Sequence, residues 1–297
     1  MLFRTTIFCS LCVIFLSGGS PPRHIEMTNL PNILWISVED MSPRLGCYGD
    51  STVPTPHVDR LAREGVRYTQ AFCTAGVCAP SRNAIITGMY QTTTGGHNMR
   101  TLFDTYPDKT GLPKSYSVVP PADVKAFPEY LRAAGYYCTN NEKTDYQFEA
   151  PPTVWDEVGK TAHWRNRRPG QPFFAVFNIM TTHESQVWMR AGNPLRVSPA
   201  RIRVPPYYPD TETVRQDMAR FYSNVSEMDD QVGSIVEQLE ADGLLDNTIV
   251  VFWSDHGDGL PFYKREIYHR GLHVPLIVRF PDKRQAGTTN NRLLSMI

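Results

Sequence analysis

The sequence has no surplus of charge of either sign. Its 297 residues include 30 lysines and arginines and 30 aspartates and glutamates. The overall charge therefore gives no reason to expect binding to nucleic acid or to an anionic membrane. One basic aromatic run, at 163–168, is too short to indicate a nucleic-acid partner. Any preference for an anionic ligand must come from a local site.

Long apolar runs are also lacking. An apolar stretch at 7–16 follows Arg4 and precedes small residues at 17–20, which is the pattern of a secretory signal peptide. The stretch is short for a membrane span, although an uncleaved N-terminal anchor stays open as an alternative. We expect residues 1–20 to be a signal peptide, the remaining chain to be secreted or periplasmic, and no stable membrane insertion after its removal.

Cysteines are few. Two of the six lie in the predicted signal peptide, and the other four are Cys47, Cys73, Cys78 and Cys138. If one of these four is used in chemistry, an odd number remains, so a disulfide scaffold is not expected and one bridge at most can form. The sequence also lacks a cluster of thiolates that would favour zinc.

The apolar segments that are present predict an α/β domain. Nearly continuous apolar runs at 32–38, 173–180 and 248–253 are typical of strands that are covered on both faces. A helix is expected over 56–64, with Thr55 as its N-cap and Pro56 in its first turn. The segment 211–242 has apolar residues at helical spacing and predicts a long covering helix.

Polar side chains follow these predicted strands at the points where they end. Glu39 and Asp40 follow the first strand, His183 follows the strand at 173–180, and Asp255 and His256 follow the strand at 248–253. Open α/β sheets bind their ligands at the carboxyl ends of their strands. These residues, although far apart in sequence, are therefore expected to meet in the folded sheet.

A cysteine is predicted at the start of a helix. Cys78 stands two residues before Pro80, which suits the first turn of a helix because its missing N–H is not needed there. The amide groups and the dipole at a helix N-terminus favour an anionic ligand. The alternative is that Cys78 is a small apolar residue that packs in the core.

The segment 78–88, CAPSRNAIITG, resembles the signature of the sulfatase family, Cys-x-Pro-Ser-Arg-x-x-x-Leu-Thr-Gly, and departs from it at Ile86. In that family a maturation enzyme oxidises the cysteine to formylglycine, so the resemblance implies that Cys78 is the precursor of the nucleophile. It also implies an α/β fold of the alkaline phosphatase type, with a large mixed sheet and helices on both faces. The resemblance covers residues 30–297 as an N-terminal catalytic domain whose C-terminal part is expected to be missing.

The resemblance further implies the roles of the other site residues. Metal ligands are expected to be Glu39, Asp40, Cys78, Asp255 and His256. Hard oxygen donors with one imidazole suit Ca²⁺ or Mg²⁺ better than Zn²⁺, and Ca²⁺ is expected ahead of Mg²⁺. Arg82, Lys143 and Lys264 would bind the sulfuryl oxygens, and His183 would act on the leaving group. Three positions depart from the family: Glu39 stands where an aspartate is usual, Asp145 where a histidine is usual, and His269 where an acidic residue is usual.

The implied activity is hydrolysis of a sulfate ester or sulfamate, on a sulfated small molecule or a glycan. A formylglycine-dependent phosphonate or phosphate ester hydrolase is one alternative. A catalytically inactive fragment that binds sulfated glycan is the other. Aryl sulfates, carbohydrate O-sulfates and N-sulfates all stay open as substrates.

Overall fold

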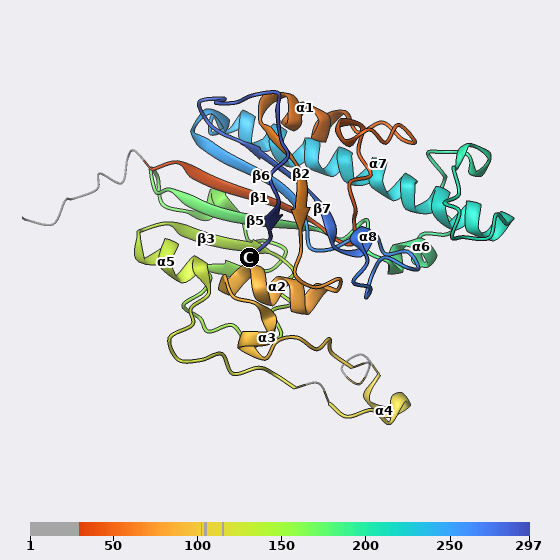
Figure 1. The fold of residues 1–297 in the computed structure, drawn as a ribbon. Helices are drawn as coiled ribbons and strands as arrows, with labels where there is room; N and C mark the ends of the chain where they lie inside the picture. Colours follow the sequence, from red (N-terminus) through yellow and green to blue (C-terminus); the bar gives the residue numbers. More distant parts are fainter. Residues whose placement is uncertain (1–29, 102, 104–105, 115) are drawn as a thin grey trace, which may run out of the picture.

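The computed structural model describes residues 30–297 except 102, 104–105 and 115 (Figure 1). The predicted signal peptide, 1–20, lies outside the described residues. The described α-helices are α1 Pro56–Glu64, α2 Cys78–Thr87, α3 Gln91–Thr94, α4 Pro107–Thr110, α5 Phe127–Ala133, α6 Ser185–Met189, α7 Glu212–Ala241 and α8 His269–Leu272. None of them is long and apolar enough to cross a membrane.

A nine-stranded mixed sheet organises the described part of the chain. Its strands are β1 Asn32–Val38, β2 Val66–Phe72, β3 Tyr137–Asn141, β4 Glu157–Val158, β5 Phe173–Ile179, β6 Thr248–Ser254, β7 His273–Arg279, β8 Thr288–Asn290 and β9 Leu294–Ser295. Their order is β4-β3-β5-β1-β6-β7-β2-β8, and β9 also pairs with β2. Only β7 runs antiparallel to its neighbours, so β3, β5, β1 and β6 all end at the same edge.

Helices lie on both faces of the sheet, as the sequence predicts. Figure 1 shows α1 and α7 over one face and α2 and α5 on the other. Alternate residues of the central strands, such as Leu34 and Phe252, are fully buried in a core that also contains Phe221 and Val225 of α7. Each such side chain contributes about 1.5–3 kcal/mol through burial. The long helix is therefore the main cover of this face.

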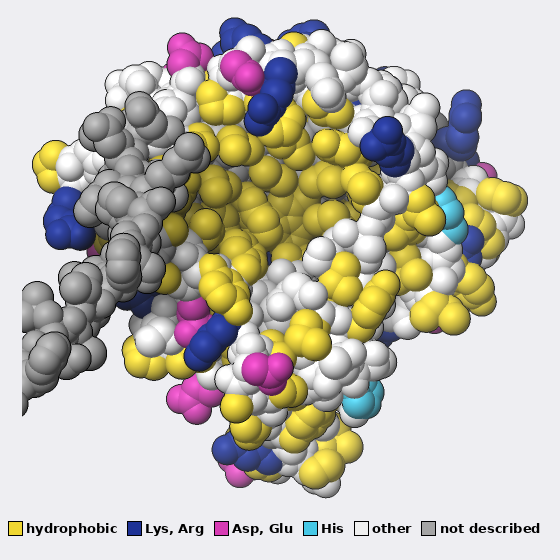
Figure 2. Space-filling view, turned by 60° about the vertical axis from the view of Figure 1, so that its left-hand side comes forward, with side chains coloured by type: hydrophobic (Ala, Val, Ile, Leu, Met, Phe, Trp, Pro, Cys, Tyr) yellow, Lys and Arg dark blue, Asp and Glu magenta, His cyan; other side chains and the backbone are white. Residues whose placement is uncertain are grey.

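The opposite face is less completely covered. Apolar side chains gather in a hollow of the molecular surface (Figure 2). A pocket of about 400 Å³ on the α2 side of the sheet is lined by Trp35, Ile85, Phe127, Val251, Trp253 and Leu276, together with residues 295–297. Residues of β1 and β6 thus contribute both to the closed core and to this open face, because side chains alternate along a strand.

The N-terminus of α1 and the cysteines were both subjects of sequence predictions. The helix α1 begins after Thr55, but the Thr55 hydroxyl does not cap it; it accepts a hydrogen bond from the Gly46 N–H (2.9 Å) and donates one to Asp59 Oδ1 (3.2 Å). Instead, Asp229 of α7 accepts hydrogen bonds from the N–H groups of His57 and Val58. The four described cysteines are all free thiols, so no disulfide bridge forms among them.

Candidate active site

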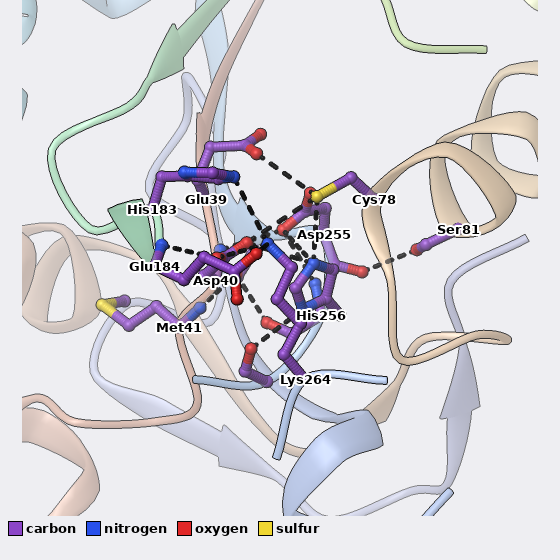
Figure 3. Close-up of polar contacts among 12 residues, drawn as sticks. Glu39, Asp40, Met41, Cys78, Ser81, His183, Glu184, Asp255, His256 and Lys264 are labelled. Carbon is purple, nitrogen blue, oxygen red and sulfur yellow. Dashed lines mark hydrogen bonds and ion pairs between the residues drawn. The ribbon is translucent and has the colours of Figure 1, made fainter. Parts of the chain in front are cut away.

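The candidate site lies at the sheet edge where β1, β3, β5 and β6 end. Glu39 and Asp40 directly follow β1, the central strand, which pairs with β5 on one side and β6 on the other. This register brings the residues that follow β5 and β6 to the same edge. Lys143 follows β3, and the helix α2 begins at Cys78 after β2. The structure therefore brings together all the residues that the sequence assigns to the site. Figure 3 labels seven of them: Glu39, Asp40, Cys78, His183, Asp255, His256 and Lys264.

Cys78 is at the centre of the group. Its Sγ atom lies 3.2 Å from His256 Nε2, 3.7 Å from Glu39 Oε2 and 3.8 Å from Asp40 Oδ1. The residue is the first of α2, follows Val77 as N-cap, and is buried. Its sulfur thus faces three groups that come from the ends of two different strands.

Asp40, Asp255 and His256 also contact one another. His256 Nε2 lies 3.1 Å from Asp40 Oδ1 and 3.8 Å from Asp255 Oδ1. The backbone N–H of Asp40 donates to Asp255 Oδ1 (3.1 Å), and Asp40 has a left-handed backbone conformation with φ 48°. A non-glycine residue adopts this conformation only at an energetic cost, so surrounding contacts must hold it.

Arg82, also from α2, connects the strand ends electrostatically. Its guanidinium pairs with Glu39 and lies 3.3 Å from Asp255 Oδ2 through Nε. It also donates to Asn178 Oδ1 (2.9 Å) and Ser37 Oγ (3.1 Å). Asn178 and Ser37 are not among the predicted site residues, although a polar side chain within an otherwise apolar strand was a signal for each of them.

Two lysines reach the carboxylates from different loops: Lys143 follows β3, and Lys264 lies between β6 and α8. Lys143 pairs with Glu39, and Lys264 Nζ lies 2.7 Å from Asp40 Oδ2. Lys264 Nζ is also 3.3 Å from His183 Nε2, while His183 Nδ1 lies 2.9 Å from the Ser185 hydroxyl. Three cationic side chains and two imidazoles, those of His183 and His256, therefore surround the acidic residues.

These ion pairs keep the acidic residues charged despite their burial. Burial opposes ionisation of Glu39, but Arg82 and Lys143 hold the pKa of its carboxyl below the usual range. Burial likewise opposes ionisation of Asp255, but His256 and Arg82 hold its pKa at about 2. Burial and the nearby Asp255 charge raise the pKa of the Cys78 thiol. The unmodified cysteine is therefore a neutral thiol at physiological pH rather than a ready thiolate nucleophile.

The donor atoms present fit a hard divalent cation. Two overlapping groups of ligand atoms each lie within 4.8 Å of one another: one is Glu39, Asp40, Cys78 and His183, the other Asp40, Cys78, Asp255 and His256. Buried carboxylate oxygens with imidazole are ligands that suit Ca²⁺ or Mg²⁺. A third group, His57, Asp229 and Asp230, meets the same distance criterion, but Asp229 already docks α1 on α7.

The fold and this site define a class of protein. It is an α/β domain in which a cysteine at a helix N-terminus lies beside carboxylate and imidazole groups that could bind a metal ion. Three cationic side chains, Arg82, Lys143 and Lys264, pair with those carboxylates. The sequence model described as Sulfatase matches residues 31–297. The chain therefore belongs to the sulfatase family.

Individual relatives agree with this assignment. An ulvan-active sulfatase of Formosa agariphila is 46% identical over 314 residues, which cover 94% of this chain and 52% of the relative. The N-sulphoglucosamine sulphohydrolase of Homo sapiens is 26% identical, covering 84% of this chain and 55% of the relative. The chain thus spans about half the length of the curated relatives that it matches.

Solved structures show the same fold. A protein in complex with its substrate D-glucosamine-2-N,6-O-disulfate superposes with a TM-score of 0.64 at 18% identity, covering 90% of this chain and 74% of that one. The phosphonate monoester hydrolase of Agrobacterium radiobacter superposes with a TM-score of 0.65 at 17% identity, covering 90% and 71%. These structures support the alkaline phosphatase-like mixed α/β fold and, at this identity, nothing finer.

Proposed function

We propose that this chain forms the catalytic part of a hydrolase that cleaves a sulfate ester or sulfamate on a carbohydrate. The observation that carries the proposal is the position of Cys78 at the start of α2, with its sulfur 3.2 Å from His256 and within 4 Å of Glu39 and Asp40. The signature around Cys78 is that of a cysteine converted to formylglycine. Conversion by a maturation enzyme would replace an unreactive buried thiol with an aldehyde at the point where the strands end.

The metal would be held by Glu39, Asp40, Asp255 and His256, with the modified Cys78 facing the same position. When bound, a divalent cation supplies charge stabilisation to an oxyanion and to the nucleophile. The carboxylates are ready for this role because their ion pairs keep them ionised. Ca²⁺ is our first choice and Mg²⁺ the second, because Ca²⁺ accepts oxygen ligands in a less regular geometry than the octahedron that Mg²⁺ demands.

The chain's cations would bind the substrate's sulfuryl oxygens. Arg82 is fixed by contacts with Glu39, Asp255 and Asn178, so its orientation is determined before a substrate arrives. Lys143 and Lys264 each have a single ammonium group that can turn from a carboxylate to a substrate oxygen. Positive groups placed around the sulfuryl oxygens stabilise the charge that develops on oxygen in the transition state.

His183 would act on the leaving group. Burial lowers the pKa of its imidazole, and the Lys264 charge lowers it further while Asp40 opposes this. A neutral imidazole is therefore the resting form near pH 7. Its contact with Ser185 orients the ring, so His183 can exchange a proton with the leaving oxygen or nitrogen.

The proposal extends to the whole sequence. Residues 30–297 would be the sulfatase N-terminal catalytic domain, and the leader at 1–20 would direct it out of the cytoplasm. The relatives named for ulvan and N-sulphoglucosamine favour a carbohydrate substrate.

The test is a substrate panel assayed with protein that was co-produced with a formylglycine-generating enzyme and loaded with Ca²⁺. The panel contains an aryl sulfate, a carbohydrate O-sulfate, an N-sulfated glucosamine and a phenyl phosphonate. We expect sulfate release from at least one sulfated sugar and none from a Cys78→Ala variant. Turnover of the phosphonate alone would favour the alternative hydrolase, and binding of sulfated sugar without any release would favour the inactive glycan binder.

A further inference from the structure

Two asparagines connect Arg82 to the loop that carries Lys143. Asn178 of β5 accepts a hydrogen bond from Arg82 Nη1 at its Oδ1 atom (2.9 Å), and its Nδ2 atom donates to Asn140 Oδ1 (3.1 Å). Asn140 of β3 in turn donates from Nδ2 to the backbone oxygen of Lys143 (3.0 Å). Asn178 and Asn140 thus form an amide relay between two of the cations that are proposed to bind the sulfuryl oxygens.

The groups at the two ends fix the direction of the amide relay. A guanidinium only donates hydrogen bonds, so Asn178 must present its oxygen to Arg82 and its nitrogen to Asn140. The same nitrogen also donates to the backbone oxygen of Asn141 (3.1 Å). A backbone oxygen only accepts, so Asn140 must present its nitrogen to Lys143. Both positions therefore need a side chain with one donor and one acceptor, which an ionised aspartate does not provide.

The amide relay lies at the end of two otherwise apolar rows of side chains. Asn178 continues the row of Phe174 and Val176 along β5, and Asn140 follows Cys138 on β3. Those three apolar residues pack in the core on the α2 side of the sheet, and both asparagines are buried. Hydrogen bonds are stronger, and unpaired polar groups more costly, in such surroundings than in water. The amides therefore serve a specific polar contact rather than the packing of the core.

Arg82 and Lys143 are also connected at their charged ends, where both pair with Glu39. Glu39 is a proposed metal ligand, and the Lys143 ammonium group is proposed to turn from this carboxylate to a sulfuryl oxygen. A connection through Glu39 alone would then leave the spacing of the two cations undefined. The amide relay uses no atom of Glu39, so it can hold Arg82 and the backbone of Lys143 together with and without a bound substrate.

From these contacts we infer that Asn140 and Asn178 are positioning residues, which fix Arg82 relative to Lys143 so that both cations reach the oxygens of one sulfuryl group. The inference rests on the proposed function and extends it to two residues that act through the cations rather than on the substrate. The alternative is that Asn178 only satisfies a buried N–H group of Arg82 and has no part in substrate binding.

The test uses N178L, N140L and the double variant, which interrupt the amide relay without a large change in side-chain size. N178D keeps an acceptor for Arg82 but loses the donor, so it separates the relay from the alternative. The matched control is N32L, because Asn32 is a buried amide at the opposite end of the same sheet, where it accepts from the Phe173 N–H (3.3 Å). Urea denaturation identifies the folded variants. Where a leucine variant does not fold, serine at the same position replaces it, since serine is too short to span the relay.

Each protein is assayed as the matured, Ca²⁺-loaded full chain on the sulfated sugar that the wild type cleaves fastest, and its binding of inorganic sulfate is measured by calorimetry. We expect N178L and N140L to lower kcat/KM by about 10–100-fold and to weaken sulfate binding by about tenfold, because misplaced binding groups cause losses of this size. Most of the loss should be in kcat, since charge on the oxygens increases in the transition state.

The comparison among variants distinguishes the amide relay from separate contributions of its members. The double variant should be no less active than N178L, because one break already interrupts the relay. N178D should resemble N178L, and N32L should resemble the wild type. N178D with wild-type activity, or losses in N140L and N178L that multiply in the double variant, overturns the inference.

The sulfate-binding measurement separates this inference from the proposed function. If no sulfated sugar is hydrolysed, but N178L and N140L weaken sulfate binding and N32L does not, the amide relay positions the cations and the hydrolase proposal is wrong. If a sugar is hydrolysed and neither N178L nor N140L changes kcat/KM or sulfate binding, the hydrolase proposal stands and this inference is wrong.

Discussion

The Sγ atom of Cys78 lies 3.2 Å from Nε2 of His256, although 178 positions separate the two residues in the chain. The contact exists because β6 pairs with β1 and delivers His256 to the edge that α2 also reaches. Both residues are buried, so the contact forms only when the sheet is assembled. The site is thus a product of the tertiary fold rather than of any one segment.

Replacing Asp255 by asparagine should weaken metal binding. The substitution keeps the size of the side chain but removes a charged oxygen donor. Since changes to residues that merely support metal ligands cost about 10–100-fold in affinity, we expect at least a ~100-fold loss for a ligand itself. Titration calorimetry with Ca²⁺ measures this, and Asp282→Asn, an exposed aspartate outside the site, is the control. Unchanged Ca²⁺ affinity in Asp255→Asn would show that Asp255 is not a ligand.

Glu39→Gln should destabilise the fold even without metal. Glu39 is fully buried and neutralises both Arg82 and Lys143, so its loss leaves buried positive charge uncompensated. Removing one partner of a buried ion pair costs about 3–5 kcal/mol. Arg82 still pairs with Asp255 in the variant, so we expect the free energy of unfolding to fall by about 3 kcal/mol, the lower end of this range. Urea denaturation in the presence of chelator measures this change.

Glu39→Asp is the matched comparison for that variant. It retains the charge and restores the residue that is usual in the family, so its loss of stability should be clearly smaller. Equal destabilisation by the two substitutions would mean that side-chain length, and not charge, determines the contribution of Glu39.

Stability without metal should fall as the pH decreases from about 4 to about 2. Burial alone would raise the pKa of Asp255, but His256 and Arg82 lower it from 3.8 to about 2. A carboxyl group with a lowered pKa stabilises the folded state above its unfolded pKa, and this contribution is lost as the pH falls through the folded pKa. Urea midpoints measured between pH 5 and pH 2 should therefore decrease more steeply for the wild type than for Asp255→Asn. Parallel curves for the two proteins would contradict the assigned ion pairs.

Phe252 of β6 should contribute strongly to the free energy of unfolding. Phe252 is fully buried against the α7 side of the core, and Phe→Ala substitutions at such positions cost about 3–5 kcal/mol. Ile267 is 87% exposed, so Ile267→Ala should change the unfolding free energy little. Chemical denaturation of both variants checks the contrast. A comparable loss in both would place Phe252 outside the cooperative core.

Much of the fold could be predicted because the buried strands leave a strong pattern. The runs at 32–38 and 173–180 became β1 and β5 within one residue, since strands covered on both faces consist mostly of apolar residues. The helix at 211–242 became α7 because its apolar residues repeat at helical spacing. Strand ends also located the site residues, because parallel strands finish at one edge.

Other features required the tertiary structure. Asn178 lies inside an apolar strand, and only the approach of Arg82 explains why an amide is buried there. The pairing of Glu184 with Arg265 joins loops that are 81 positions apart. The cap of α1 was assigned to Thr55 from its neighbour Pro56, whereas Asp229 from a distant helix satisfies the amide groups. Local sequence cannot encode which distant side chain fills such a role.

The most direct test of the central claim is peptide mass spectrometry of residue 78, combined with sulfate release from a sulfated sugar by the same preparation. Protein co-produced with a formylglycine-generating enzyme should contain the aldehyde at position 78 and release sulfate in proportion to the converted fraction. A Cys73→Ser variant, which changes another buried thiol, should behave in the same way. A preparation that contains only cysteine at position 78 and still releases sulfate, or one that is fully converted and releases none from any sulfated sugar, would contradict the account.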